Sequence, residues 1–175
     1  MTEMRDFVLP AVLTDKAREV IEANRAARRR VAVAESCTGG LVVAALTEIA
    51  GSSDVVEAGF VTYSNEAKSK LLNVSEDVIE TFGSVSVAVA WAMARGALAA
   101  SEADVAVALT GIAGPAGGSD RKPVGTVVFA RAERDANPRE IVADTKLFEN
   151  DGRGGIRLQA ALCALELLLP GAPAP

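Results

Sequence analysis

Three short segments of the chain carry side chains that could do chemistry. The first is a run of six residues: Glu35, Ser36, Cys37, Thr38, Gly39 and Gly40. Ser36 and Cys37 supply nucleophilic atoms, and the segment lies between a predicted strand and a predicted helix, where ligands of α/β sheets tend to bind. Its glycines let a ligand approach the backbone, and the first free N–H groups of the helix could hold a phosphate or an oxyanion. The alternative is a plain strand-to-helix turn in which Thr38 is the N-cap.

The second segment, residues 63–68, follows the next predicted strand. Tyr63 is the sole tyrosine of the chain, and its hydroxyl could bind a substrate or tune a neighbouring lysine. Asn65 and Lys68 belong to the helix that begins there. Lys68 and Lys70 are two residues apart and cannot point the same way. The alternative is an N-capped surface helix with solvated charges.

The third segment runs from Thr110 through a loop that ends at Lys122. Four glycines, Gly111 and Gly114 among them, and one proline lie in this loop, which is too long for a simple turn. Its N–H groups and cations could wrap an anionic small molecule, whereas the alternative is a flexible connector. All three segments begin at the carboxyl ends of predicted strands, so we expect them to meet in one cleft.

The chain contains no histidine, which limits the chemistry that these segments can perform. Ser-His-Asp and Cys-His nucleophile pairs are excluded, as are His-ligated zinc and two-His iron sites. Any acid-base step must therefore use Lys, Glu, Asp, Tyr or Cys. We expect no cofactor and no metal site.

Helical and strand patterns alternate along the chain and must position the three segments. We predict helices that start after Thr14 and Ser75, and further helices at 41–49, 65–72, 87–100 (capped by Ser86) and 156–169. Predicted strands cover 31–34, 55–63, 105–109, 124–131 and 141–148; the last two form an antiparallel hairpin around a turn at 135–138. Helices between strands imply right-handed crossovers. We expect an α/β domain over residues 1–175, a three-layer α/β/α sandwich with a mixed central sheet of about four to six strands and a core at about 10–170.

Composition narrows the setting of the 175-residue chain. The net charge of −5 argues against non-specific nucleic-acid binding. The run Arg28-Arg29-Arg30 falls where a helix should end and complements its dipole. Residues 1–6 lack the pattern of a signal peptide, and no run of 18 apolar residues occurs, so we expect a cytoplasmic protein without membrane contact. Two cysteines make no disulfide framework, and Cys163 fits a core position.

Taken in series, the motifs resemble the C-terminal domain of the CinA family of competence/damage-inducible proteins. The matching stretches are 34–40 (AESCTGG), 63–68 (YSNEAK), 83–86 (GSVS), 110–115 (TGIAGP) and 122–127 (KPVGTV). The chain departs from the family pattern twice. Val87 stands where the family usually has Glu, and residues 148–153 (FENDGR) carry an insertion relative to Phe-x-Gly-Asp-Arg, which leaves Arg153 as the match to the family's arginine.

The resemblance implies hydrolysis of the carboxamide of nicotinamide mononucleotide to nicotinate mononucleotide and ammonia. It also implies that the nucleotide-binding domain of longer family members is absent, together with its pyrophosphatase activity. The alternatives are a non-catalytic nucleotide-binding or protein-interaction domain linked to competence or DNA damage, and an amidase for another phosphorylated amide. An Ala-rich helix would also suit a homo-oligomer.

On this basis we hypothesise that Ser36 attacks the carboxamide and that Lys68 takes its proton. A lysine at its ordinary pKa, about 10.4, is protonated at neutral pH, so burial or a nearby cation must lower that pKa. Tyr63 and Thr110 would relay the proton or orient the amide, and Cys37 is the competing nucleophile. The expected substrate-binding residues are Cys37, Thr38, Gly39, Gly40, Asn65, Gly111, Gly114, Lys122 and Arg153.

Overall fold

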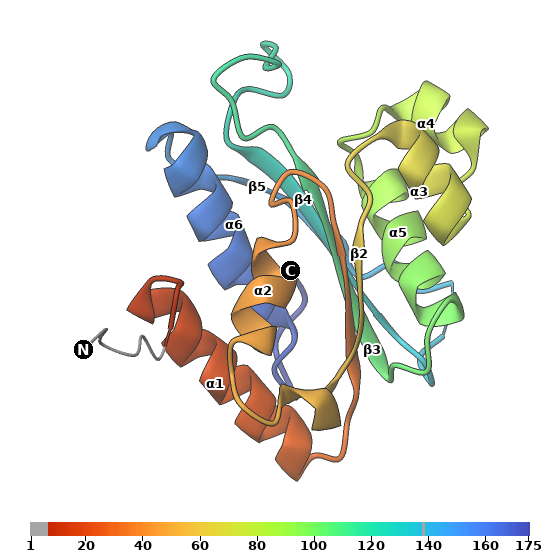
Figure 1. The fold of residues 1–175 in the computed structure, drawn as a ribbon. Coiled ribbons are helices and arrows are strands. Elements are labelled where there is room, and N and C mark those ends of the chain that lie inside the picture. The colour runs from red at the N-terminus through yellow and green to blue at the C-terminus, as the bar shows by residue number, and fades with distance from the viewer. Residues whose placement is uncertain (1–6, 138) are drawn as a thin grey trace.

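Five strands form one mixed sheet in the order β2-β1-β3-β4-β5 in the computed structural model, which describes residues 7–137 and 139–175 (Figure 1). The strands are β1 (Val31–Glu35), β2 (Val56–Val61), β3 (Val105–Gly111), β4 (Thr126–Glu133) and β5 (Ala143–Leu147). β1 pairs in parallel with both β2 and β3, whereas β4 is antiparallel to β3 and to β5. The predicted mixed sheet and its antiparallel hairpin are confirmed.

Helices cover both faces of this sheet, as the α/β/α prediction requires (Figure 1). One layer holds α1 (Ala11–Ala26), α2 (Leu41–Thr47) and α6 (Gly152–Leu167), and the other holds α3 (Asn65–Leu72), α4 (Glu76–Phe82) and α5 (Val87–Ala99). A 3-10 turn, η1 (Ser52–Asp54), precedes β2. Within residues 7–137 and 139–175, no helix is long and apolar enough to cross a membrane.

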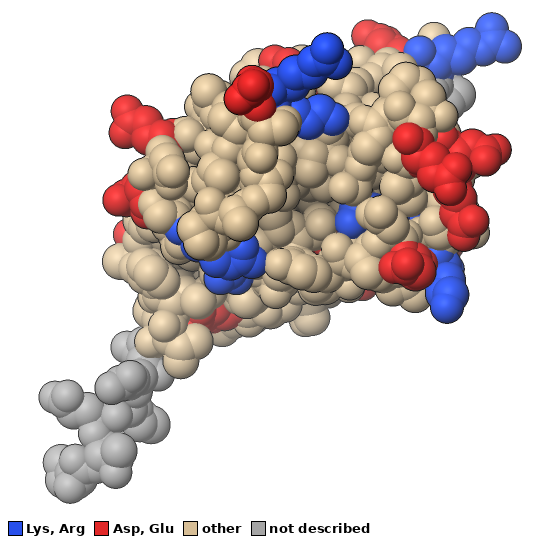
Figure 2. Space-filling model, turned by 90° about the horizontal axis from the view of Figure 1, so that it is seen from above, with Lys and Arg blue, Asp and Glu red and all other residues tan. Residues whose placement is uncertain are grey.

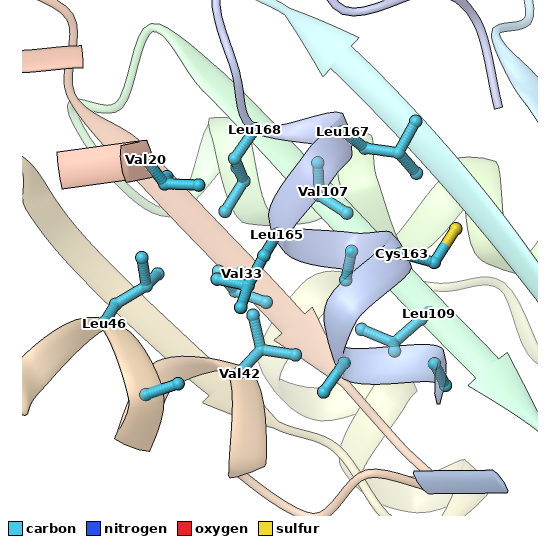
Figure 3. Close-up of a cluster of buried hydrophobic side chains, with 14 of the residues drawn as sticks. Val20, Val33, Val42, Leu46, Val107, Leu109, Cys163, Leu165, Leu167 and Leu168 are labelled. Atoms are coloured by element: carbon cyan, nitrogen blue, oxygen red, sulfur yellow. The ribbon is translucent and has the colours of Figure 1, made fainter. Parts of the chain in front are cut away.

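The two faces of the sheet carry different side chains because successive residues of a strand point to opposite sides. Val33 and Val107 face α1, α2 and α6, in a cluster that also contains Leu46 and Leu165 (Figure 3). Cys163 belongs to this cluster, as predicted. The alanines at 32, 34, 106 and 108 face the other way. Their small side chains let α5, itself rich in alanine, lie close against the sheet.

The structure corrects the prediction that Thr14 caps the first helix. α1 begins at Ala11 after Pro10, and Thr14 is buried inside it, where its hydroxyl donates to the Ala11 carbonyl at 3.1 Å. Proline suits the start of a helix because its missing N–H would have no partner there. Ser86 does cap α5 by accepting from Val89 N at 3.2 Å. Ser75 takes the N-cap position of α4 without a side-chain cap bond.

The basic run at 28–30 follows the end of α1, and one of its residues also contacts the end of α6. α1 ends just before it, and the Arg29 guanidinium reaches the last turn of α6, donating to the Leu168 carbonyl at 2.6 Å. Asn24, a polar residue on the apolar face of α1, donates to the same carbonyl at 3.0 Å and is fully buried. Residues 1–6 and Pro138, on which the signal-peptide and turn predictions depended, lie outside the described residues.

Candidate active site

The carboxyl ends of β1, β2 and β3 meet at one end of the sheet, and a pocket of about 480 Å³ opens there. Figure 2 looks down on this end of the molecule and shows a surface that is hollowed at its middle. Three of the five segments that line it come directly from the predicted motifs at 35–40, 63–68 and 110–122. The polar and charged lining residues are Ser36, Cys37, Tyr63, Asn65, Lys68, Ser84, Thr110, Ser119, Lys122 and Arg153. The single cleft that was predicted therefore exists.

Ser36 and Lys68 are in direct contact at the floor of this pocket. Lys68 Nζ donates to Ser36 Oγ at 3.1 Å and to the Thr62 carbonyl at 2.8 Å. The two side chains come from different elements: Ser36 follows β1 and Lys68 lies in α3. Ser64 begins α3 by accepting from Ala67 N at 3.1 Å, which sets the turn that carries Lys68 inward.

Lys68 is 1% exposed, so the solvated surface helix that was the alternative is wrong for this residue. Burial lowers the pKa of Lys68, because the charged ammonium loses its hydration. Among the described residues no carboxylate accepts a hydrogen bond from it; its two acceptors are a hydroxyl and a carbonyl. These surroundings favour the neutral amine, which is the form that can take a proton from Ser36.

Cys37 also lines the pocket, but its thiol is a poor nucleophile there. Burial raises the pKa of Cys37 to about 11, and the nearby Glu35 carboxylate adds to that rise. A thiol with this pKa is almost wholly protonated at neutral pH, whereas the thiolate is the reactive form. The geometry therefore favours Ser36 of the two candidates.

Tyr63 and Arg153 both line the pocket and contact one another. Arg153 lies in the first turn of α6 and donates to Tyr63 Oη at 2.9 Å and to the Gly114 carbonyl at 2.7 Å. The inserted residue before α6 thus leaves Arg153 at the pocket. Tyr63 is 60% exposed, so its hydroxyl stands at the mouth rather than beside Lys68.

Thr110 and Lys122 hold the segment 83–85 in place. This segment belongs to one of the sequence motifs, but no role was assigned to it. Thr110 Oγ1 donates to the Ser84 carbonyl at 2.9 Å, and Lys122 Nζ donates to the Val85 carbonyl at 2.6 Å. Both donors also line the pocket. Sequence reasoning missed Ser84 as a lining residue. The motif at 83–86 was the available signal.

Three of the expected substrate-binding residues do not line the pocket: Thr38, Gly39 and Gly40. The N-terminus of α2 was expected to hold a phosphate or oxyanion, but the Glu35 carboxylate occupies it. That carboxylate accepts from Val42 N at 3.2 Å and from Val43 N at 3.0 Å. These N–H groups consequently have a partner within the protein. Sequence reasoning gave Glu35 no role, although an acidic residue that ends an apolar strand was a signal.

The charge of the pocket suits an anionic ligand. Of the described residues that line it, none is acidic, while Lys122 and Arg153 are cations near its rim. Val87, where the family usually has Glu, is not among the lining residues and is 37% exposed. Within the part of the chain that the structure describes, no group of three acidic or cysteine side chains could hold a metal ion.

The chain thus folds as a three-layer α/β/α domain with a buried contact between Ser36 and Lys68 at the ends of its parallel strands, a pair of residue types that some hydrolases use as nucleophile and base. The family model for the CinA C-terminal domain matches residues 13–170, and the chain belongs to this family. The resemblance inferred from the motifs is confirmed.

Curated relatives and solved structures cover most of the chain. The chain is 52% identical over 139 residues to the nicotinamide-nucleotide amidohydrolase PncC of Enterobacter agglomerans. The matched region covers 79% of this chain and 82% of that protein. The chain is 48% identical over 150 residues to the PncC of Escherichia coli K12, covering 86% and 88%. The competence/damage-inducible protein CihA of Agrobacterium tumefaciens superposes with a TM-score of 0.87 at 47% identity, covering 93% and 96% of the two chains.

Other relatives are much longer. A putative competence-damage inducible protein of Symbiobacterium thermophilum is 50% identical over 143 residues, but the chain spans 33% of its length.

Proposed function

We propose that this chain hydrolyses the carboxamide of nicotinamide mononucleotide to nicotinate mononucleotide and ammonia. The observation that carries the proposal is the buried contact of 3.1 Å between Lys68 Nζ and Ser36 Oγ. Relatives at 52% and 48% identity that cover most of the chain are named nicotinamide-nucleotide amidohydrolases, which supplies the substrate.

In the first half of the reaction Ser36 Oγ attacks the carboxamide carbon while neutral Lys68 takes the hydroxyl proton. The carbonyl π pair moves to oxygen and forms a tetrahedral oxyanion. When this intermediate collapses, the C–N bond breaks and the Lys68 ammonium gives its proton to the departing nitrogen, which leaves as ammonia. An ester between Ser36 and the nicotinoyl group remains.

In the second half a water molecule attacks that ester and Lys68 again takes the proton. The carbon-oxygen bond to Ser36 breaks, Lys68 returns the proton to Oγ, and the product leaves as a carboxylic acid that ionises. The burial that lowers the pKa of Lys68 serves both halves, because each needs a neutral amine at its start.

In this proposal the two cations of the pocket, Arg153 and Lys122, bind the 5′-phosphate. Arg153 is exposed at the rim and would meet the phosphate through the N–H groups that its contacts to Gly114 and Tyr63 leave over, and Lys122 adds a second positive charge. The N-terminus of α2 takes no part, because Glu35 occupies it. The N–H of Cys37, the residue after the nucleophile, is placed in sequence where acyl-transfer enzymes recruit an oxyanion donor.

Ammonia release from purified protein tests the proposal, with formation of nicotinate mononucleotide followed by chromatography. Nicotinamide mononucleotide is the expected substrate. Nicotinamide riboside, which lacks the phosphate, should show kcat/KM at least about tenfold lower, because a hydrogen bond to a charged group contributes about 1.5 to 3 kcal/mol. An absence of ammonia from the mononucleotide would contradict the proposal. Faster release from another phosphorylated amide would assign the site to that substrate instead.

A further inference from the structure

The Glu35 carboxylate is held by four donors immediately beside the nucleophile. Glu35 is the last residue of β1 and is 0% exposed. Its Oε2 accepts from Thr38 Oγ1 at 2.6 Å, from Gly40 N at 3.1 Å and from Val42 N at 3.2 Å. Its Oε1 accepts from Val43 N at 3.0 Å. The carboxylate therefore ties the turn after Ser36 to the start of α2.

The backbone of Glu35 also belongs to the frame that holds the serine and the lysine together. The Glu35 carbonyl accepts from Thr62 N at 2.8 Å, and the Thr62 carbonyl accepts from Lys68 Nζ at 2.8 Å. Lys68 Nζ then donates to Ser36 Oγ, and Ser36 is joined to Glu35 by the peptide bond. These contacts form a closed ring, so the position of Glu35 sets the separation of the reacting pair.

The helix dipole and the four donors together make a buried carboxylate favourable at this position. A negative charge at a helix N-terminus interacts with the partial positive charge of the free N–H groups. Thr38 Oγ1 and Val42 N are buried donors, and a buried donor without a partner costs about 1 to 3 kcal/mol. An isosteric amide cannot replace the carboxylate, because its NH₂ group does not accept hydrogen bonds.

We infer that Glu35 is a positioning residue that fixes the Ser36 hydroxyl against Lys68 by clamping the turn between β1 and α2. The inference rests on the proposed function, since it concerns the same serine. Glu35 does not line the pocket and has no contact with the cations at its rim. Its loss should therefore lower kcat and leave KM for the substrate nearly unchanged.

Steady-state kinetics of Glu35→Gln test the inference. Misplacement of a reacting atom by about 1 Å costs on the order of 100-fold in rate, so we expect kcat to fall about 10- to 100-fold with KM within about twofold. A fluorophosphonate provides a readout that does not depend on the amide substrate. Ser36 Oγ forms a bond to phosphorus, fluoride leaves, and the hydroxyl proton passes to Lys68. The labelling rate of Ser36 should fall together with kcat.

Two further variants separate positioning from a loss of stability. Asn24→Ala removes a buried side chain that bonds Leu168 O far from the pocket, and should lower the melting temperature while kcat and labelling stay at wild-type values. Thr38→Val removes one of the four donors to Glu35 without changing shape, and should lower kcat several-fold. If Glu35→Gln does not fold, the kcat of Thr38→Val tests the inference in its place.

The inference is overturned if folded Glu35→Gln keeps the wild-type kcat and labelling rate, or if Asn24→Ala loses as much kcat as Glu35→Gln. It is equally overturned if Glu35→Gln does not fold and Thr38→Val is fully active. A failure of the proposed function looks different. In that case the wild-type protein releases no ammonia from nicotinamide mononucleotide, while the labelling rates of the variants still report whether Glu35 positions Ser36.

Discussion

Gly96 lies where α5 crosses the end of α3, and replacing it with alanine should disturb both stability and catalysis. A Cβ at this position would stand 2.1 Å from the Leu72 carbonyl oxygen and 2.8 Å from Leu72 Cβ. Ordinary contact begins at about 3.4 Å, so the helices must separate by about an ångström. The obstructing atom is backbone, which cannot rotate away as the end of a flexible side chain could.

Overpacking of this kind costs about 1 to 3 kcal/mol. For a domain of this size each kcal/mol corresponds to about 2 to 4 °C in melting temperature, so Gly96→Ala should melt about 2 to 12 °C lower. Leu72 is one turn after Lys68 in α3, and the Lys68 carbonyl accepts from the Asn73 N–H that ends the helix. A shift of α3 should therefore move the lysine and lower kcat as well.

Thermal unfolding and ammonia release, measured on the same preparations, check this prediction. Gly154→Ala is the matched control because it makes the same substitution in α6, where a Cβ would meet nothing within 4 Å. This control should gain about 0.5 to 1 kcal/mol, since alanine favours helix over glycine. An unchanged melting temperature for Gly96→Ala, or equal effects of the two variants, would refute the packing argument.

Three further predictions concern the titratable groups of the site. Because burial lowers the pKa of Lys68, kcat/KM should rise with pH to a plateau reached below 10.5; a profile that still rises at pH 10.5 would contradict this. The unfolded chain binds the Lys68 proton more readily, so stability rises with pH between the lowered folded pKa and 10.5. Lys68→Met should therefore abolish turnover but raise the melting temperature above that of the wild-type protein, by more at pH 7 than at pH 10.5. A variant that melts below the wild-type protein at pH 7 would argue against the buried amine. With the pKa of Cys37 raised to about 11, Cys37→Ala should remain active and iodoacetamide at pH 8 should react slowly; rapid inactivation would favour the thiol as nucleophile.

The layers and the location of the site could be predicted because local patterns determine them. The continuous apolar run of β1, which is buried along its whole length, the cap at Ser86 and the glycines after the strands are all readable within a few residues. Those patterns also placed the three motifs at the same end of a parallel sheet. Helix starts were harder, as Thr14 shows: this good capping residue lies inside α1, whose N-cap position is held by Pro10, four residues earlier than predicted.

Burial of single charged residues could not be predicted, because it depends on elements far apart in the sequence. Lys68 follows the pattern of a solvated helix, and only the approach of Ser36 and Thr62 encloses it. Glu35 is a different case: its four donors lie only three to eight residues further along the chain, but the pattern of an apolar strand followed by glycines does not show that the carboxylate turns back onto them. The expected anion site at α2 failed for this reason: the protein supplies its own carboxylate to those N–H groups.

The central claim is that Ser36 is the nucleophile of an amidohydrolase, and one measurement tests it most directly. Ammonia release from nicotinamide mononucleotide is compared between the wild-type protein and Ser36→Ala at the same protein concentration. The account predicts that the variant keeps its melting temperature while turnover falls at least about 1,000-fold. Release of ammonia by Ser36→Ala at a rate near that of the wild-type protein would contradict the account.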